Sequence, residues 1–363
     1  MNYYPSQNNN PIDIINIQSL AKKVKHRMEK GAFDSIAGGG ETESTLYENT
    51  AAFDRKKIIP RVLQSMSSVD LKTNFFGIPL SMPVIAAPVA AQGLLHKEAE
   101  AASALGTSAS GSLFCLSTYS TLSIDQLAPI LTRINWMFQI YMREDEFTEY
   151  MVQRATKYGA KAIILTVDAI VGGQRERDIK NKFVFPVPFG NFNNFYKEEE
   201  IKGKSIAEIF ESAKRDLDLS HIKYLKKVSD GLPVIIKGVQ SPIDANLAID
   251  AGADGIWVSN HGGRQMDCVP ASFEVLPSIT KAVNKRVPII LDGGIIRGHH
   301  VFKALASYAD IVAIGRPFVY GLNLGGSQGV TSVFNHYAKE LTTTMYLAGT
   351  QTLKDITPDY LMS

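Results

Sequence analysis

The chain has 363 residues, of which 45% are hydrophobic and 20% are charged, and its formal net charge is +2. This composition is typical of a globular protein with a large core, and the low net charge gives no reason to expect nucleic acid or an anionic membrane as a partner. No N-terminal stretch resembles a secretory signal, and no apolar run reaches the roughly 20 residues that span a bilayer. Cys115 and Cys268 lie far apart without metal-type spacing, so we expect reduced thiols, a cytoplasmic protein and no bound metal.

The first 82 residues precede the first strand signal and begin with a polar, Asn-rich stretch. We expect them to form an N-terminal helical extension that plugs or covers the bottom of the domain. From residue 83 onward, eight short runs are apolar nearly throughout, as strands buried on both faces must be. These runs are Pro83–Ala87, Ser112–Ser117, Trp136–Met142, Ala162–Val167, Val234–Lys237, Gly255–Ser259, Val287–Asp292 and Asp310–Gly315.

Helix-like segments lie between these runs. One of them begins at Ser241-Pro242, with a capping serine followed by proline at the first helical position. The apolar residues of this segment form one stripe, made of Ile243, Leu247, Ala248 and Ala251. Eight buried strands with helical returns predict an α/β protein whose residues 1–363 form a single domain, a closed (β/α)8 TIM barrel.

Residues from about 170 to 231 separate the fourth and fifth strands and are far more numerous than a return helix needs. This insert contains an aromatic, Pro- and Asn-rich stretch at 183–194 and then the charged run 197–200. Because an insert after a barrel strand falls on the catalytic face, we interpret it as a mobile lid. A solvated surface excursion is the alternative.

Polar residues recur at the carboxyl ends of six consecutive strands, which is where the active sites of such barrels lie. The ends of strands three to eight carry Gln139, Tyr141, Thr166, Asp168, Lys237, Ser259, His261, Arg264, Asp292 and Arg316. Loops after the last two strands commonly bind phosphate through backbone N–H groups, and Gly293-Gly294 and Gly315-Arg316 suit that role. The alternative is that these are turn glycines beside a surface arginine.

His261 lies in a glycine-rich turn next to Arg264. An imidazole can take a proton near neutral pH, and an arginine can bind a carboxylate through two parallel hydrogen bonds. Asp168, on another strand end, could orient the imidazole and stabilise its charged form. Lys237 would be costly at a buried strand end without a negative partner, which would be either an anionic cofactor ring or an aspartate, Asp168 or Asp292.

The stretch Ser259-Asn260-His261-Gly262-Gly263-Arg264-Gln265, followed by Asp292-Gly293-Gly294 and Gly315-Arg316, resembles the FMN-dependent 2-hydroxy acid oxidase family. The resemblance covers about residues 16–355. Within the family, the stretches 177–183 and 255–262 are most similar to the lactate oxidase branch. It implies that FMN oxidises a small L-2-hydroxy acid such as L-lactate to the 2-keto acid and that O2 is reduced to H2O2. It also implies a homotetramer.

The resemblance further implies individual roles. His261, paired with Asp168, would be the catalytic base, and Arg175 and Arg264 would bind the substrate carboxylate. Tyr141 would hydrogen-bond the substrate hydroxyl, and Tyr119 would line the pocket. The flavin and its phosphate tail would be held by Pro88, Val89, Ala90, Ser117, Gln139, Thr166, Lys237, Ser259, Asp292, Gly294, Arg297, Gly315 and Arg316.

Four positions depart from the family pattern. Ser35, Phe185 and Phe210 stand where tyrosines are expected, and Ile296 replaces an arginine that would reach the FMN phosphate. We expect these losses to raise the KM for the 2-hydroxy acid and to loosen FMN, with Arg297 compensating in part.

Three other functions share much of this pattern. A lactate 2-monooxygenase has the same site but tends to carry glycine in place of Ala90, and a quinone-linked lactate dehydrogenase would pass its electrons elsewhere. A flavin-binding sensor with little turnover is the alternative of another class, motivated by the four departures. It needs no base, so His261 and Asp168 favour the enzyme.

Overall fold

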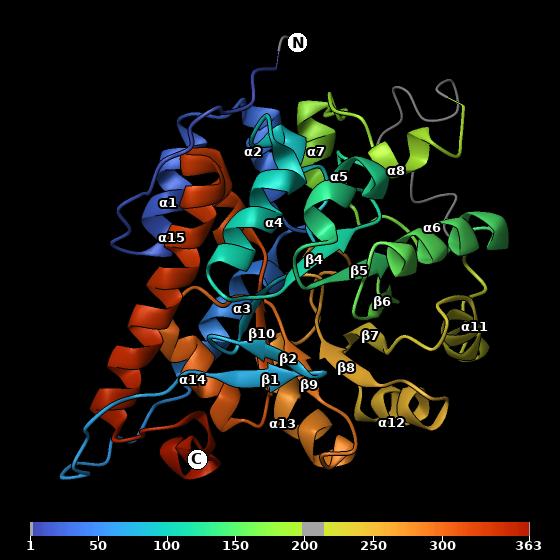
Figure 1. The fold of residues 1–363 in the computed structure, drawn as a ribbon. Helices are drawn as coiled ribbons and strands as arrows, with labels where there is room; N and C mark the ends of the chain where they lie inside the picture. Colours follow the sequence, from blue (N-terminus) through green and yellow to red (C-terminus); the bar gives the residue numbers. More distant parts are fainter. Residues whose placement is uncertain (1–2, 198–213, 363) are drawn as a thin grey trace.

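Eight parallel strands form the centre of the molecule. The computed structural model describes residues 3–197 and 214–362 (Figure 1). The strands run in the order β3-β10-β9-β8-β7-β6-β5-β4, and the amide N of Ala86 donates to the carbonyl of Leu113 at 3.0 Å where the two edges meet. The predicted (β/α)8 barrel is therefore confirmed. Its strands are β3(Val84–Ala86), β4(Phe114–Ser117), β5(Trp136–Ile140), β6(Ile163–Thr166), β7(Val234–Val239), β8(Gly255–Val258), β9(Ile289–Leu291) and β10(Ile311–Ile314).

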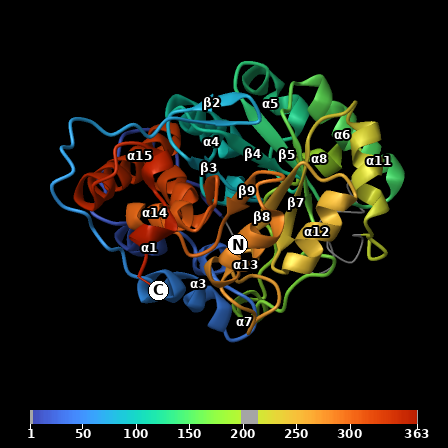
Figure 2. The same cartoon turned by 90° about the horizontal axis from the view of Figure 1, so that it is seen from below.

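A helix follows each strand, and these helices surround the barrel in the view from below (Figure 2). Across the described parts of the chain, no helix combines the length and apolar character needed to cross a bilayer. The surrounding helices are α4(Ala99–Ala109), α5(Ile124–Leu131), α6(Asp145–Lys157), α11(Ser220–Val228), α12(Pro242–Asp250), α13(Ser272–Val283), α14(Gly298–Ala306) and α15(Arg316–Ala348).

Helix α12 begins as predicted but packs differently. The side chain of Ser241 accepts hydrogen bonds from the amides of Ile243 and Asp244 at 3.2 and 3.4 Å, so it caps the helix. The predicted apolar stripe is wrong, because Ile243 and Leu247 are exposed and the buried residues are Ala245 and Ala248. Alanines allow a closer approach to the neighbouring elements than longer side chains would.

The inner face of the barrel has an apolar layer below a polar one. Side chains alternate between the two faces of a strand, so residues two apart point the same way. The apolar layer consists of Ile85, Cys115, Met137, Ile164, Ile235, Trp257, Ile290 and Ala313. Two residues further along each strand, toward its carboxyl end, the same face carries Ala87, Ser117, Gln139, Thr166, Lys237, Ser259, Asp292 and Gly315. The barrel is thus closed by hydrophobic packing at one end and lined with polar groups at the other.

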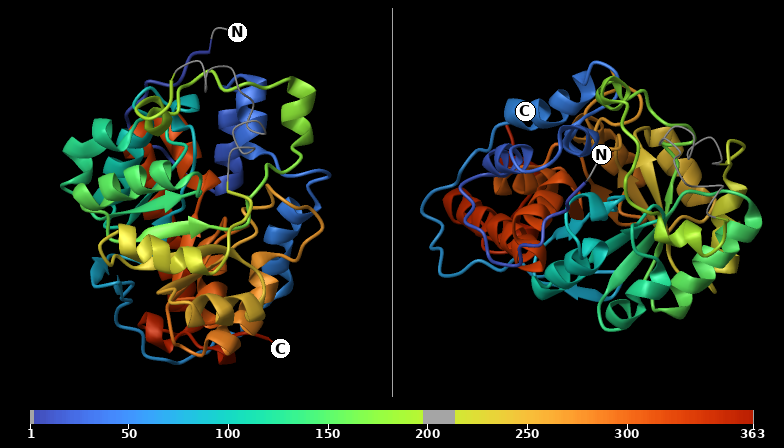
Figure 3. Two further views of the ribbon diagram at one scale, coloured as in Figure 1. Left: turned by 90° about the vertical axis from the view of Figure 1, so that its right-hand side faces the viewer. Right: turned by 90° about the horizontal axis from the view of Figure 1, so that it is seen from above.

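The N-terminal segment covers the barrel in a way that the sequence did not predict. The bottom is closed by a two-stranded hairpin, β1(Thr73–Phe75) and β2(Ile78–Leu80), whose apolar side chains join the inner apolar layer. The expectation of helices there is wrong. Three helices precede the hairpin, namely α1(Ile17–Lys25), α2(Lys30–Ala37) and α3(Ser44–Arg55), and α1 packs beside α15 (Figure 3, right).

The insert after β6 also contributes to the carboxyl end of the barrel. Its described parts include α7(Glu176–Asn181), which packs against α2, and α8(Gly190–Asn193). Phe189 and Phe192 are buried, and their rings lie 5.7 and 5.1 Å from the ring of Tyr119. Phe210 lies outside the described residues.

Candidate active site

A deep cavity opens at the carboxyl end of the barrel, where the sequence predicts the site. Its volume is about 270 Å³. This lies near the lower end of the range of about 300–1,000 Å³ that is common for pockets that bind small molecules. The predicted residues in its wall are Pro88, Val89, Ala90, Ser117, Tyr119, Tyr141, Arg175, Lys237, His261, Arg264, Asp292, Gly294, Gly315 and Arg316.

His261 forms the centre of a chain of hydrogen bonds. Its Nδ1 lies 2.8 Å from Oδ1 of Asp168, and its Nε2 lies 3.2 Å from the hydroxyl of Tyr141. Asp168 is not part of the cavity wall and reaches the cavity only through this imidazole. Because the carboxylate holds Nδ1, Nε2 is the ring nitrogen that faces the cavity and can exchange a proton there.

The backbone around His261 is unusual. His261, Gly262 and Gly263 have φ values of 59°, 63° and 70°, which place three successive residues in the left-handed region. Such a conformation is costly for a residue with a side chain and is found at functional sites. It is held by hydrogen bonds from the amide of His261 to Ser259 Oγ at 3.0 Å and from the amide of Gly263 to the carbonyl of Asn260 at 3.0 Å.

Burial and neighbouring charges shift the pKa values of this pair. Burial lowers the pKa of His261 below its ordinary 6.5, and Asp168 opposes the shift. Burial acts to raise the pKa of Asp168, but His261 and Lys237 outweigh it, so that pKa lies below 3.8. Burial also raises the pKa of Tyr141 well above 10. At neutral pH the site therefore holds a neutral imidazole, a carboxylate and a protonated phenol.

Three guanidinium groups gather in the wall of the cavity. Arg264 donates to the carbonyls of Ile36 and Gly38 at 3.2 and 3.0 Å. Arg316 donates to the same two carbonyls at 3.1 and 2.8 Å. Arg175 lies 4.0 Å from the carboxylate of Asp178. The three side chains come from the insert, the loop after β8 and the start of α15.

These guanidiniums leave an excess of positive charge in a buried place. Burial, and the charge of Arg264, lower the pKa of Arg175 to about 9 and that of Arg316 to about 10. The Nε atom of Arg175 is buried and has no hydrogen-bond partner among the described residues. An anionic ligand would supply both the missing acceptor and the missing negative charge.

Lys237 and Asp292 form a buried ion pair on the inner wall. Lys237 Nζ lies 3.4 Å from Asp292 Oδ2 and donates to Ser259 Oγ at 3.0 Å. The indole N–H of Trp257 donates to the same carboxylate oxygen at 2.9 Å. The other oxygen, Oδ1, is buried without a partner in the described structure, so it can accept a hydrogen bond from a bound molecule.

Gln139 and Thr166 lie just behind the cavity wall. Ser117 Oγ donates to Gln139 Oε1 at 3.2 Å, and Gln139 Nε2 donates to Thr166 Oγ1 at 3.0 Å. Only Ser117 of these three lines the cavity directly. The amide and the hydroxyls form one connected row along the inner polar layer.

The far end of the cavity has the features of a phosphate site. Gly293 and Gly294 have φ values of 100° and 72°, and a Cβ on Gly294 would lie 2.2 Å from the carbonyl oxygen of Asn49. Both positions therefore require glycine. Gly315 and Arg316 begin α15 there, and backbone N–H groups at a helix N-terminus favour an anion.

The structure does not bring Arg297 into this end of the cavity. Its Nη1 lies 2.9 Å from Oε1 of Glu340 on α15, and Arg297 is not part of the cavity wall. Ile296 does line the cavity, so the position that lacks the expected arginine is the one that faces inward. The expected compensation by Arg297 has no support in this arrangement.

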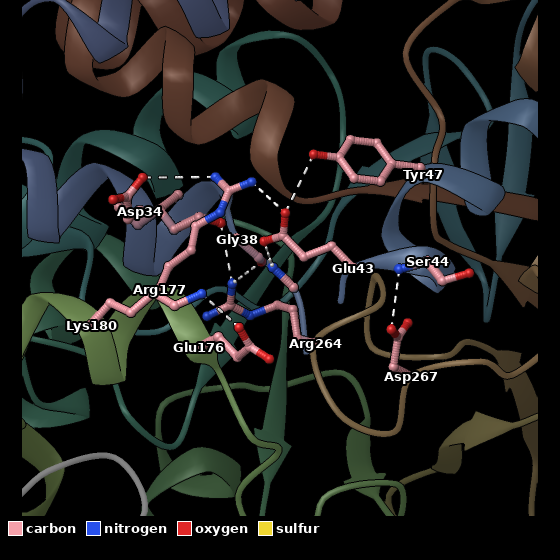
Figure 4. A network of polar contacts seen from close by, with 12 residues as sticks. Asp34, Gly38, Glu43, Ser44, Tyr47, Glu176, Arg177, Lys180, Arg264 and Asp267 are labelled. Atoms are coloured by element: carbon pink, nitrogen blue, oxygen red, sulfur yellow. Dashed lines mark hydrogen bonds and ion pairs between the residues drawn. The ribbon is translucent and has the colours of Figure 1, made fainter. Parts of the chain in front are cut away.

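A network of charged residues outside the cavity was missed at the sequence level (Figure 4). Arg177 on α7 forms ion pairs with Asp34 on α2, at 3.7 Å, and with Glu43. Glu43 also accepts from the amide of Gly39 at 2.8 Å, next to the Gly38 carbonyl that holds Arg264. The network thus joins the insert to the segment that positions the guanidiniums. Its members are distant in sequence, so no local pattern could have revealed them.

Comparison with known proteins agrees with this geometry. The model of the FMN-dependent dehydrogenase family matches residues 24–363. The chain belongs to this family. It is 49% identical over 355 residues to the L-lactate oxidase of Lentilactobacillus hilgardii, covering 98% of this chain and 96% of that protein. With the L-lactate oxidase of Streptococcus iniae it shares 42% identity, covering 95% and 85% of the two chains.

Two solved structures extend the comparison. A Pediococcus acidilactici protein described as a lactate oxidase superposes with a TM-score of 0.94 at 48% identity, covering 99% of this chain and 98% of that chain. A mandelate oxidase superposes with a TM-score of 0.88 at 32% identity, covering 96% and 98%. The predicted family and its cofactor, FMN, are thereby confirmed, and the protein is an FMN-dependent oxidoreductase.

The residues of the cavity fit FMN on structural grounds. The unpartnered Oδ1 of Asp292 suits a ribityl hydroxyl, and Lys237 offers an ammonium group to the ring. The paired glycines and the start of α15 suit the phosphate. These groups line one continuous cavity, which leaves His261 and Arg264 beside it for a substrate.

Proposed function

We propose that this protein oxidises L-lactate to pyruvate while O2 is reduced to H2O2. The observation that carries the proposal is that His261 and two guanidiniums, those of Arg175 and Arg264, line one cavity together with the residues that fit FMN. The L-lactate oxidases to which the chain is 42–49% identical support lactate as the substrate.

The residues of the site have two roles: some bind the carboxylate of the acid, and others move a proton. Arg175 and Arg264 bind the carboxylate, which places the hydroxyl of the acid near His261 Nε2 and the phenol of Tyr141. His261 takes the hydroxyl proton, and Asp168 stabilises the imidazolium that forms. When bound, FMN would supply the acceptor for the hydride that leaves the α-carbon, which is the α-hydrogen with its two electrons.

Anaerobic reduction tests the proposal. The enzyme, reconstituted with FMN, is mixed with L-lactate and then with glycolate in the absence of oxygen, and the loss of the yellow flavin absorbance is followed. Bleaching by L-lactate at a higher rate than by glycolate is the expected result. No bleaching by either acid would contradict the proposal and favour a flavin-binding sensor. In air, pyruvate with H2O2 indicates the oxidase, and acetate would indicate a monooxygenase.

Restoring the missing tyrosine at position 35 tests the weakened binding of the carboxylate. Ser35 is buried in the cavity wall, and its Oγ lies 3.3 Å from Asp178 Oδ2, close to Arg175. We expect Ser35→Tyr to lower KM for L-lactate by about 10-fold or more with little change in kcat, because a hydrogen bond to a charged group contributes about 1.5–3 kcal/mol.

Steady-state kinetics measure this effect, with Ser35→Phe as the matched control. The phenylalanine adds the same ring without the hydroxyl, so it should leave KM high. An equal fall of KM in both variants would assign the effect to ring packing instead.

Restoring the missing arginine at position 296 tests how tightly the protein binds FMN. Ile296 lines the phosphate end of the cavity, and Arg297 points away to Glu340. We expect Ile296→Arg to tighten FMN binding by about 10–100-fold, because a guanidinium adds charge-assisted hydrogen bonds to the phosphate. The Kd is measured by titrating FMN into the apoprotein and following the quenching of flavin fluorescence. Ile296→Met is the matched control, because methionine is a long, unbranched side chain like arginine but carries no charge.

We also propose that residues 1–363 form one domain and that the insert at about 170–231 acts as its lid. Phe185 and Phe189 of the insert line the cavity, and Arg264 is held by the carbonyls of the N-terminal segment. A single cooperative unfolding transition for the whole chain would agree with this proposal. Two separate transitions would contradict it.

A cytoplasmic homotetramer is our proposal for the assembled protein. Cys115 and Cys268 are both unpaired, as is usual in a reducing compartment. Ile243 and Leu247 are exposed on α12 and offer apolar surface to another subunit. Light scattering after size-exclusion chromatography measures the mass, and a monomer at working concentration would contradict the tetramer.

A further inference from the structure

Two histidines and an aspartate meet outside the cavity, behind the loop that follows β9. Asp54 lies near the end of α3, and His299 and His300 lie in the first turn of α14. One ligand atom from each of the three side chains lies within 4.8 Å of the others. His300 Nε2 and Asp54 Oδ1 are 3.7 Å apart, which is too long for a hydrogen bond. Two ligands of a tetrahedral zinc ion, each bound at 2.0–2.1 Å, are separated by about 3.4 Å.

His300 is held in an orientation that suits a metal ligand. Its ring is buried and stacks on the ring of Phe53, with 4.6 Å between centroids and 3° between planes. Its Nδ1 lies 3.2 Å from the carbonyl oxygen of Gly294 and 3.4 Å from the amide N of Ile296. The nearer carbonyl favours a proton on Nδ1, which leaves the lone pair of Nε2 directed toward Asp54. Metal-bound histidines almost always have such a partner for the second nitrogen.

The nearby Lys303 donates to the carbonyl of Phe53 at 2.8 Å and does not neutralise Asp54 by a direct ion pair.

We propose that Asp54, His299 and His300 bind a borderline divalent cation, with Zn²⁺ as the preferred ion and water completing the coordination. Two imidazoles and one carboxylate are donors that suit zinc, nickel or copper, whereas magnesium and calcium prefer oxygen alone. The ion would join the end of α3 to the start of α14. Its position next to Gly294 and Ile296 places it directly outside the phosphate end of the cavity.

Isothermal titration calorimetry with ZnCl2 tests the proposal. The full chain, loaded with FMN and freed of metal by EDTA and dialysis, carries Cys268→Ser because an exposed thiol also binds zinc. We expect one equivalent of Zn²⁺ to bind. His299→Ala and Asp54→Asn should each weaken Zn²⁺ binding by about 10–100-fold. Even the removal of a residue that only hydrogen-bonds to a metal ligand lowers metal affinity by about this much. Both side chains are at least partly exposed, so both variants should fold.

The controls separate this site from general surface binding. His26→Ala removes one exposed histidine elsewhere and should leave the affinity unchanged, and MgCl2 should produce no binding heat. Absence of the one-equivalent event in the parent would overturn the proposal. The proposal would also be overturned if His299→Ala and Asp54→Asn bound Zn²⁺ as tightly as the parent protein does. An anomalous zinc peak on other residues of a soaked crystal would overturn it as well.

Discussion

Replacement of His261 by glutamine is expected to reduce the rate of anaerobic flavin bleaching by L-lactate by about 10²–10⁴-fold, the contribution of a positioned general base. The ring nitrogen of His261 that faces the cavity, Nε2, lies 3.2 Å from the hydroxyl oxygen of Tyr141. Glutamine keeps a polar side chain of similar length but cannot accept a proton. Stopped-flow absorbance of the FMN-loaded variant measures the rate.

The chain contains a matched control for this variant. His221 also pairs with an aspartate, its Nδ1 lying 3.0 Å from Asp218 Oδ1, but the pair lies on α11 and the loop before it, outside the cavity. His221→Gln should therefore bleach at the parental rate. An unchanged rate in His261→Gln, with FMN bound and the melting temperature preserved, would remove His261 from the chemistry.

Replacement of Asp168 by asparagine is expected to lower kcat by about 100-fold or more, because the imidazolium formed at His261 loses its stabilising charge. The same change should alter the pH profile. Asp168 raises the pKa of His261 against the effect of burial, so its removal lowers that pKa further. In the proposed mechanism the neutral imidazole is the active form, so activity should fall as pH drops through this pKa. The acid limb of the pH profile should thus move to lower pH, while the activity on the plateau of the profile falls.

The pH profile of kcat/KM between about pH 4 and 8 measures both effects, with Asp218→Asn as the matched control. In the parent enzyme the acid limb should lie below 6.5, because burial lowers the pKa of His261. A lower plateau with an unshifted acid limb would indicate that Asp168 only shapes the loop. A rise of the limb toward higher pH would contradict the assigned coupling.

Much of the architecture follows from local patterns in the chain. Eight apolar runs predict buried parallel strands because both faces of such strands are covered. The polar residues that follow them predict the active end, because parallel strands bring their carboxyl ends together. The turn at His261-Gly262-Gly263 could likewise be expected from its glycines, and the structure gives it three positive φ values.

Other features depend on contacts between distant segments. The sequence places Arg297 beside the phosphate loop, but an acidic partner on α15, Glu340, turns its side chain away from the cavity. The bottom of the barrel is closed by a hairpin because Phe75, Ile78 and Leu80 fit the inner apolar layer. On α12, alanines rather than the larger side chains face inward.

Sequence alone therefore determined the barrel, its active end, the His261 motif and the family, because each depends on residues that are close along the chain or repeat with a regular period. Only the tertiary structure decided the pairing of Arg177 with Asp34 and Glu43, the outward course of Arg297 and the meeting of Asp54 with the two histidines. Those contacts join residues from separate elements, and their free energy depends on distances that exist only after the barrel has closed.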